Sequence, residues 1–139
     1  MTRKEKALEI ATKYYSKKKL AHALRVANYA ENNPLVSDYI QESLWIVGIF
    51  HDIIEDTECT EQALREVGIF KDIEIEAIVE LTHHKEDESY ENYMIGLSQS
   101  SNPYVLPVKR ADMKDHLTLV NTLTDKLKHK YYPTVKYIL

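Results

Sequence analysis

Residues 44–57 read LWIVGIFHDIIEDT, an apolar run followed directly by a cluster of ionisable side chains. The apolar part, Leu44 to Phe50, leaves no polar face, and a helix that is apolar all round belongs in the centre of a bundle. With Ser37 as its N-cap, we expect a long helix that runs to about Glu55. This helix is the expected centre of the fold.

Amphipathic segments lie on both sides of this central helix in the sequence. Their apolar residues recur at helical spacing, with N-caps at Thr60 and Ser89, a helix-ending Gly68 and Pro107 in a first turn. We expect helices over about residues 4–15, 20–31, 37–55, 60–67, 72–83, 90–97 and 107–130. The sequence therefore predicts an all-α bundle of about seven helices.

The size and composition of the chain agree with a single helical domain. It has 139 residues and a mass of 16.2 kDa, which suits one hydrophobic core. Only 3 Gly and 4 Pro are present, too few for the many tight hairpins of a β-sandwich or barrel. Because no repeat or flexible linker divides the chain, we expect one domain over residues 1–139.

Cysteine usage and hydrophobic patterning predict a cytoplasmic protein. Cys59 is the single cysteine, which excludes an internal disulfide and a cysteine cluster for zinc. The segment Met1 to Lys6 is charged, and no apolar stretch after it resembles a signal-peptide core or a membrane span. We therefore expect no membrane association.

The charge distribution argues against general nucleic-acid binding. The net charge is −4, with an excess of basic residues in 1–26 and 93–139 and an acidic excess in 27–92. Nucleic-acid binding relies on many cationic contacts to phosphates, which an acidic chain lacks. The basic ends can still meet around a smaller anion. The run Lys17 to Lys19 is either a solvated surface turn or a phosphate contact.

The cluster that follows the apolar run predicts a chemical role. His51, Asp52, Glu55 and Asp56 come at the end of the most apolar helix. An unpaired buried charge costs several kcal/mol, so such a cluster usually has a metal, a mutual network or a catalytic task. The alternative is a helix end that simply emerges into solvent.

Two further residues extend this cluster into a pattern. His22 lies on an amphipathic helix and Asp112 near the start of the last long helix. Each alone is more often an ordinary packing or helix-terminal residue. Together with the His51-Asp52 doublet they give the order H…HD…D on three helices. This order resembles the HD superfamily of metal-dependent phosphohydrolases, and implies an HD-type helical domain.

The resemblance extends to longer segments. Residues 21–27 (AHALRVA), 50–57 (FHDIIEDT) and 108–112 (VKRAD) resemble the hydrolase domain of the RelA/SpoT family. That family removes the 3′-pyrophosphate from guanosine tetra- and pentaphosphate, and the HD-x-x-EDT string is its hallmark. The resemblance covers about residues 15–125, and residues 82–93 look like the small stand-alone members.

The resemblance implies one metal ion and two catalytic carboxylates. The ion, Mn²⁺ or another divalent metal, would be held by His22, His51, Asp52 and Asp112. Imidazole and carboxylate ligands suit such an ion. Glu55 and Asp56 would orient or deprotonate a water and help the leaving oxygen.

Six residues are expected to contact the substrate, a phosphorylated nucleotide. They are Lys18, Lys19, Lys85, Tyr90, Tyr93 and His116. For the two tyrosines, packing is the alternative. His116 stands one turn after Asp112, where the family commonly has Asn, and so contacts either the substrate or the metal site.

Other conspicuous residues receive ordinary interpretations. We expect His83 and His84 to face solvent rather than to bind a second metal. Trp45 and Met94 are expected in the core, and Cys59 has no neighbouring base that would mark a nucleophile.

Three functions remain open from the sequence. The first is a Mn²⁺-dependent phosphohydrolase, with guanosine tetraphosphate as the leading substrate. The second is a hydrolase of nucleoside monophosphates or other nucleotides with the same ligands. The third is a nucleotide-sensing module without turnover.

Overall fold

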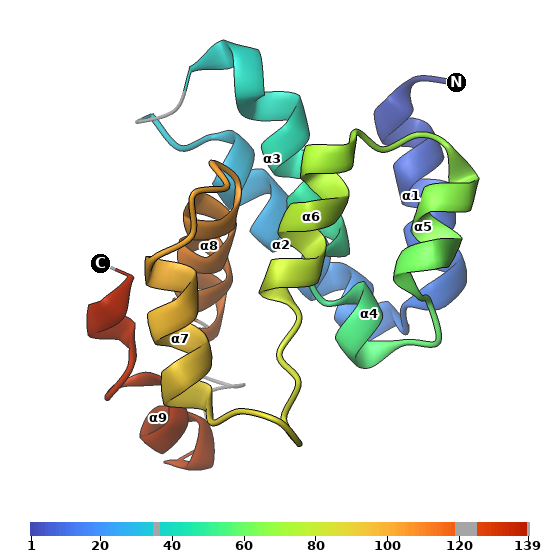
Figure 1. The fold of residues 1–139 in the computed structure, drawn as a ribbon. Coiled ribbons are helices and arrows are strands. Elements are labelled where there is room, and N and C mark those ends of the chain that lie inside the picture. The colour runs from blue at the N-terminus through green and yellow to red at the C-terminus, as the bar shows by residue number, and fades with distance from the viewer. Residues whose placement is uncertain (35–36, 119–124, 139) are drawn as a thin grey trace.

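The computed structural model describes residues 1–34, 37–118 and 125–138, and all regular structure within them is helical (Figure 1). The elements are α1 (Arg3–Tyr14), α2 (Lys17–Glu31), α3 (Asp38–Phe50), α4 (Ile53–Asp56), α5 (Glu61–Val67), α6 (Asp72–Leu81), α7 (Tyr90–Ser98), α8 (Val105–Thr118), α9 (Asp125–Tyr131) and a 3₁₀ turn, Val135–Tyr137. The predicted all-α class is confirmed.

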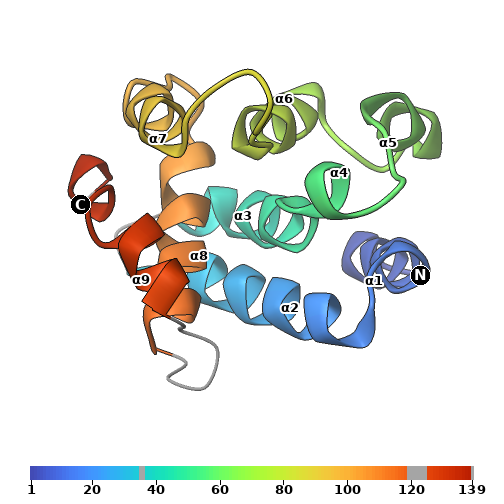
Figure 2. The same cartoon turned by 90° about the horizontal axis from the view of Figure 1, so that it is seen from below.

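Helix α3 occupies the middle of the molecule. Figure 2 shows it between α6 on one side and α2 on the other, and it also contacts α1 and α8. Leu44, Ile46, Ile49 and Phe50 have no solvent-exposed surface. The apolar run therefore forms the centre of the core, as its lack of a polar face predicts.

Most predicted helix ends are observed with their caps. The hydroxyls of Thr60 and Ser89 accept backbone N–H groups at the starts of α5 and α7, and Gly68 ends α5 with a left-handed φ of 78°. Helix α2 starts earlier than predicted, because Ser16 caps it. The run Lys17 to Lys19 is consequently the exposed first turn of a helix and not a surface turn.

The long helix predicted from Ser37 to Glu55 is interrupted. Helix α3 ends at Phe50, and Asp52 has φ −104° and ψ 1°, which departs from helical geometry. The backbone N–H of Asp56 then donates to the Asp52 carbonyl at 2.8 Å, which opens the short helix α4. Ser37 precedes α3 as predicted, but its side chain makes no capping hydrogen bond within the described residues.

The last predicted helix, over residues 107–130, appears as two described elements. Helix α8 carries Pro107 in its first turn, and α9 contains Tyr131 at its end. The predicted continuity between them falls on residues 119–124, which lie outside the described residues.

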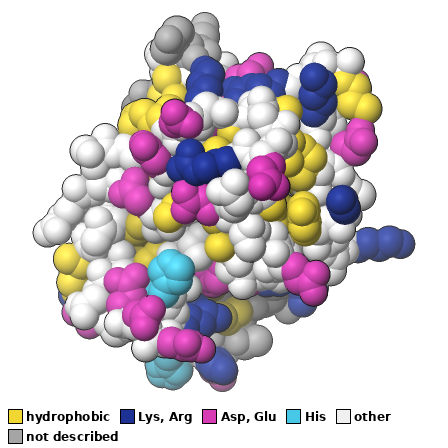
Figure 3. Space-filling view, turned by 45° about the vertical axis from the view of Figure 1, so that its right-hand side comes forward, with side chains coloured by type: hydrophobic (Ala, Val, Ile, Leu, Met, Phe, Trp, Pro, Cys, Tyr) yellow, Lys and Arg dark blue, Asp and Glu magenta, His cyan; other side chains and the backbone are white. Residues whose placement is uncertain are grey.

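Surface and core follow the expected division. Trp45 and Met94 are buried, which confirms their assignment to the core. On the face shown in Figure 3, acidic side chains are interspersed with basic and uncharged ones. Within the described part of the chain, none of the helices combines the length and apolar character that crossing a bilayer requires.

Candidate metal centre

Four side chains from three helical segments converge at one point. His22 comes from α2, His51 and Asp52 from the break between α3 and α4, and Asp112 from α8. One donor atom from each lies within 4.8 Å of all the others. The sequence prediction that these residues meet, although as many as 90 positions separate them, therefore agrees with the structure.

The spacing of the donor atoms suits a single ion. The Nε2 atoms of His22 and His51 lie 2.9 and 3.3 Å from Asp112 Oδ1. Asp52 Oδ2 lies 3.1 Å from His51 Nε2 and 3.6 Å from His22 Nε2. Donors bound at right angles with bonds of about 2.1 Å are about 3 Å apart. The four residues thus form a group that could hold a metal ion.

The other nitrogen of each imidazole is fixed from outside the cluster. His51 Nδ1 lies 2.6 Å from the Gly48 carbonyl, and His22 Nδ1 lies 2.7 Å from Asp115 Oδ2. A carbonyl and a carboxylate accept hydrogen bonds, so Nδ1 carries a proton in both rings. Each Nε2 consequently faces the cluster, an arrangement typical of histidines that bind metals.

The two carboxylates of the cluster, buried Asp112 and half-buried Asp52, are stabilised in their charged form. Burial alone would raise the pKa of Asp112, but Lys109 and the neighbouring imidazoles outweigh it and hold that pKa well below its usual value. Burial is likewise outweighed at Asp52, where His51 lowers the pKa of the carboxyl. Two negative charges are therefore available to a cation at this point.

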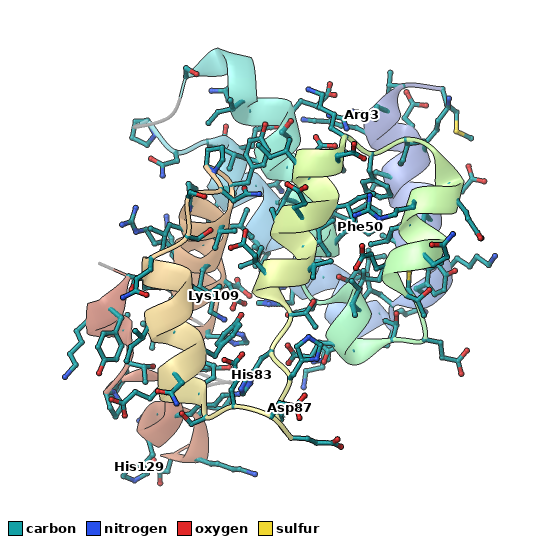
Figure 4. All side chains as sticks on the ribbon, in the orientation of Figure 1. Arg3, Phe50, His83, Asp87, Lys109 and His129 are labelled. Carbon is teal, nitrogen blue, oxygen red and sulfur yellow. The ribbon has the colours of Figure 1, made fainter. Side chains whose placement is uncertain are left out.

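Lys109 and Asp115 belong to the site although the sequence analysis did not single them out. Lys109 is buried on α8, and its Nζ donates to Asp112 Oδ2 at 2.9 Å. Figure 4 shows Lys109 on the same side of the fold as His83, next to α7. The signal in the sequence is spacing, because both residues lie three positions from Asp112 on one helix.

Glu55 and Asp56 have different partners from each other. Glu55 Oε1 accepts the backbone N–H of His83 at 2.8 Å, which ties α4 to the segment that follows α6. Asp56 is exposed and pairs with Lys19, whose Nζ lies 3.1 Å from Asp56 Oδ2. Both carboxylates line the cavity that is also lined by His22, Asp52 and Asp112.

The cavity has a volume of about 280 Å³. All six residues expected to contact the substrate line it: Lys18, Lys19, Lys85, Tyr90, Tyr93 and His116. Tyr131 of α9 also lines it, and its ring stacks on His116 with centroids 5.0 Å apart. No motif in the sequence marks Tyr131, because only the folding back of α9 brings it to the site.

Tyr93 and His83 both take part in packing. Tyr93 is buried, and its hydroxyl donates to the Leu81 carbonyl, so its role includes packing. The expectation that His83 faces solvent is wrong, because it is only 8% exposed and packs against Tyr90 and Tyr93. His84 is exposed as expected.

Comparison with known proteins adds no assignment to this geometry. The chain matches none of the protein-family models against which it was scanned, and the search of curated proteins finds no matching relative. The interpretation of the site therefore depends on its residues.

Proposed function

We propose that this chain is a metal-dependent phosphohydrolase of the HD type that acts on a phosphorylated nucleotide. Guanosine tetraphosphate, with loss of its 3′-pyrophosphate, is the leading substrate. The observation that carries the proposal is the convergence of His22, His51, Asp52 and Asp112, with both imidazole Nε2 atoms directed toward the carboxylates.

The donor set matches the proposed cofactor. Two imidazoles and two carboxylates suit Mn²⁺ or a similar divalent ion. Such an ion would supply charge neutralisation at phosphate oxygens and acidification of water. Lys18, Lys19 and Lys85 line the same cavity and would attract the phosphate groups of the substrate.

Glu55 is the best placed base within the chain. Its Oε1 is fixed by the His83 N–H, while no hydrogen bond to Oε2 occurs among the described residues. A carboxylate held at one oxygen and open at the other can accept a proton from an attacking water. Asp56 stands at the mouth with Lys19, where the pair would help to place the substrate or its leaving oxygen.

The size of the cavity favours a second candidate substrate. Small-molecule sites usually span about 300–1,000 Å³, and a volume of about 280 Å³ lies at the compact end. A nucleoside monophosphate is therefore the alternative to guanosine tetraphosphate. Release of orthophosphate rather than pyrophosphate distinguishes the two.

The test is a hydrolysis screen with metal-stripped and Mn²⁺-loaded protein over phosphorylated nucleotides, measuring both phosphate products. Glu55→Gln and Asp56→Asn keep shape but remove charge. At least one of them should lower turnover by about 10²–10⁴-fold while metal content stays near wild type. His51→Ala should lose metal and activity together.

Two results would contradict the proposal. Protein that binds Mn²⁺ but turns over no nucleotide would favour the sensing module. Full activity in both carboxamide variants would remove Glu55 and Asp56 from the mechanism.

A further inference from the structure

His116 lies beside the four predicted ligands, next to Asp112. It lies one turn after Asp112 on α8, and its Nε2 is 3.2 Å from Asp112 Oδ1. The same oxygen is 2.9 Å from His22 Nε2 and 3.3 Å from His51 Nε2. Three imidazole nitrogens therefore surround one carboxylate oxygen at separations expected of neighbouring donors on an ion.

Aromatic contacts orient the His116 ring. Its centroid lies 4.6 Å from that of His22 and 5.0 Å from that of Tyr131, on which it stacks. Because two rings already pack against it, His116 is poorly suited to stack on a nucleobase. Its polar edge is instead directed at Asp112.

The His116 side chain is only partly enclosed by its neighbours. It is 25% exposed, and its contact with Asp112 is the one polar contact of its ring that the structure describes. The group of donors within 4.8 Å of one another contains His22, His51, Asp52 and Asp112 but not His116. A modest inward movement of the ring is therefore needed for it to join them.

We infer that His116 is a further donor to the proposed ion, which gives a set of three imidazoles and two carboxylates. This inference rests on the metal binding within the proposed function, but not on turnover or on the identity of the nucleotide. Imidazole nitrogen favours the later first-row metals, whereas carboxylate oxygen suits Mn²⁺. The third imidazole should therefore shift the preference of the site from Mn²⁺ toward Co²⁺.

The experiment compares wild type, His116→Asn and a control, His129→Asn, whose exposed histidine lies on α9. Metal-free full-length protein is titrated calorimetrically with Co²⁺ and with Mn²⁺. Loss of His116 should weaken Co²⁺ binding by about 10- to 100-fold and Mn²⁺ binding by less. NMR should show three histidine rings with strongly contact-shifted, exchangeable N–H protons in Co²⁺-loaded wild type and control, and two in His116→Asn.

The inference is overturned by two shifted rings in wild type, or by unchanged Co²⁺ affinity in a folded His116→Asn protein. If that variant fails to fold, the ring count in wild type decides. Wild type that binds neither metal overturns both this inference and the proposed function. Wild type with three shifted rings but no nucleotide turnover supports the inference and removes only the hydrolase proposal.

Discussion

Asp115 determines which nitrogen of His22 faces the other three candidate metal ligands. Its carboxylate accepts from His22 Nδ1 on one oxygen and is itself held by Arg25, whose Nε donates to Oδ1 at 2.7 Å. Burial would raise the pKa of Asp115, but Arg25 and His22 outweigh it and lower that pKa. A charged acceptor therefore fixes the proton on Nδ1 and leaves Nε2 for a cation.

Asp115→Asn should weaken metal binding without unfolding the protein. The amide keeps the size of the side chain but loses the charge that orients His22, and loss of such a partner costs about 10–100-fold in metal affinity. Calorimetric titration with Mn²⁺ measures the effect. Asp87→Asn, in an exposed loop, is the matched control and should bind as wild type does. Equal affinities in both variants would show that Asp115 pairs with Arg25 but does not support metal binding.

For single residues, the sequence identifies the proposed metal ligands better than it identifies the residues that orient or surround them. His22, the His51-Asp52 doublet and Asp112 are visible because their residue types and order form a motif. Asp115 acts on a residue 93 positions away, and Tyr131 reaches the cavity from another helix. The sequence offers only the spacing of Asp115 from Asp112. The contact of Asp115 with His22 and the position of Tyr131 depend on tertiary proximity, which neither periodicity nor residue type reveals.

Between elements, α2 and α3 approach each other closely at a glycine, Gly48. A Cβ added to Gly48 of α3 would lie 2.7 Å from the Cα of Ala27 in α2. The Gly48 carbonyl also accepts from His51 Nδ1. A glycine that weakens a helix is therefore tolerated because it lets α2 and α3 pack tightly.

Gly48→Ala should destabilise the protein by about 1–3 kcal/mol, because overpacking against backbone outweighs the better helix propensity. Metal affinity should fall as well, since α2 and α3 separate. Gly96→Ala in α7 is the control. Apart from its own helix and chain neighbours, no atom of the described residues lies within 4 Å of the added Cβ, so this variant should gain about 0.5–1 kcal/mol. Urea unfolding compares the two, and stabilisation by Gly48→Ala would refute the close-packing argument.

Element boundaries show where sequence periodicity stops being informative. Apolar residues continue on both sides of the break, from Phe50 to Ile53, so no pattern marks the interruption at His51 and Asp52. The start of α2 is similarly hidden, because lysines are unfavourable in the first turn of a helix. Capping by Ser16 outweighs that preference.

On the scale of the whole molecule, a buried ion pair ties the start of the chain to α6. Glu74 has no exposed surface, and both of its oxygens accept from the Arg3 guanidinium at 2.6 and 2.9 Å. Figure 4 shows Arg3 between α1 and the start of α6. The Lys71 N–H also donates to Glu74, so the same carboxylate caps the start of α6.

Arg3→Met should cost about 3–5 kcal/mol of unfolding free energy, because it leaves the Glu74 charge buried without its partner. Adding Glu74→Met to that variant should restore most of the loss. Arg65→Met, which breaks only surface pairs with Glu61 and Asp72, should cost no more than about 1 kcal/mol. Chemical denaturation measures all three, and a small effect of Arg3→Met alone would contradict the argument.

The helical class was predictable because scarce glycine and proline, together with helical periodicity, point the same way. The ion pair that joins α1 to α6 was not predictable, since Arg3 and Glu74 are 71 positions apart and each alone resembles an ordinary surface charge. Long-range pairs of this kind form only when the chain folds, so they cannot be recognised from the sequence.

The distribution of the proposed metal donors over α2, the α3–α4 break and α8 has a thermodynamic consequence. Only the folded chain presents these donors together, so an ion that binds them selects the native state over the unfolded one. By mass action its contribution to stability grows with the logarithm of its free concentration, about 1.4 kcal/mol for each tenfold rise above the dissociation constant. Through this linkage, the amount of native protein would depend on the metal content of its surroundings.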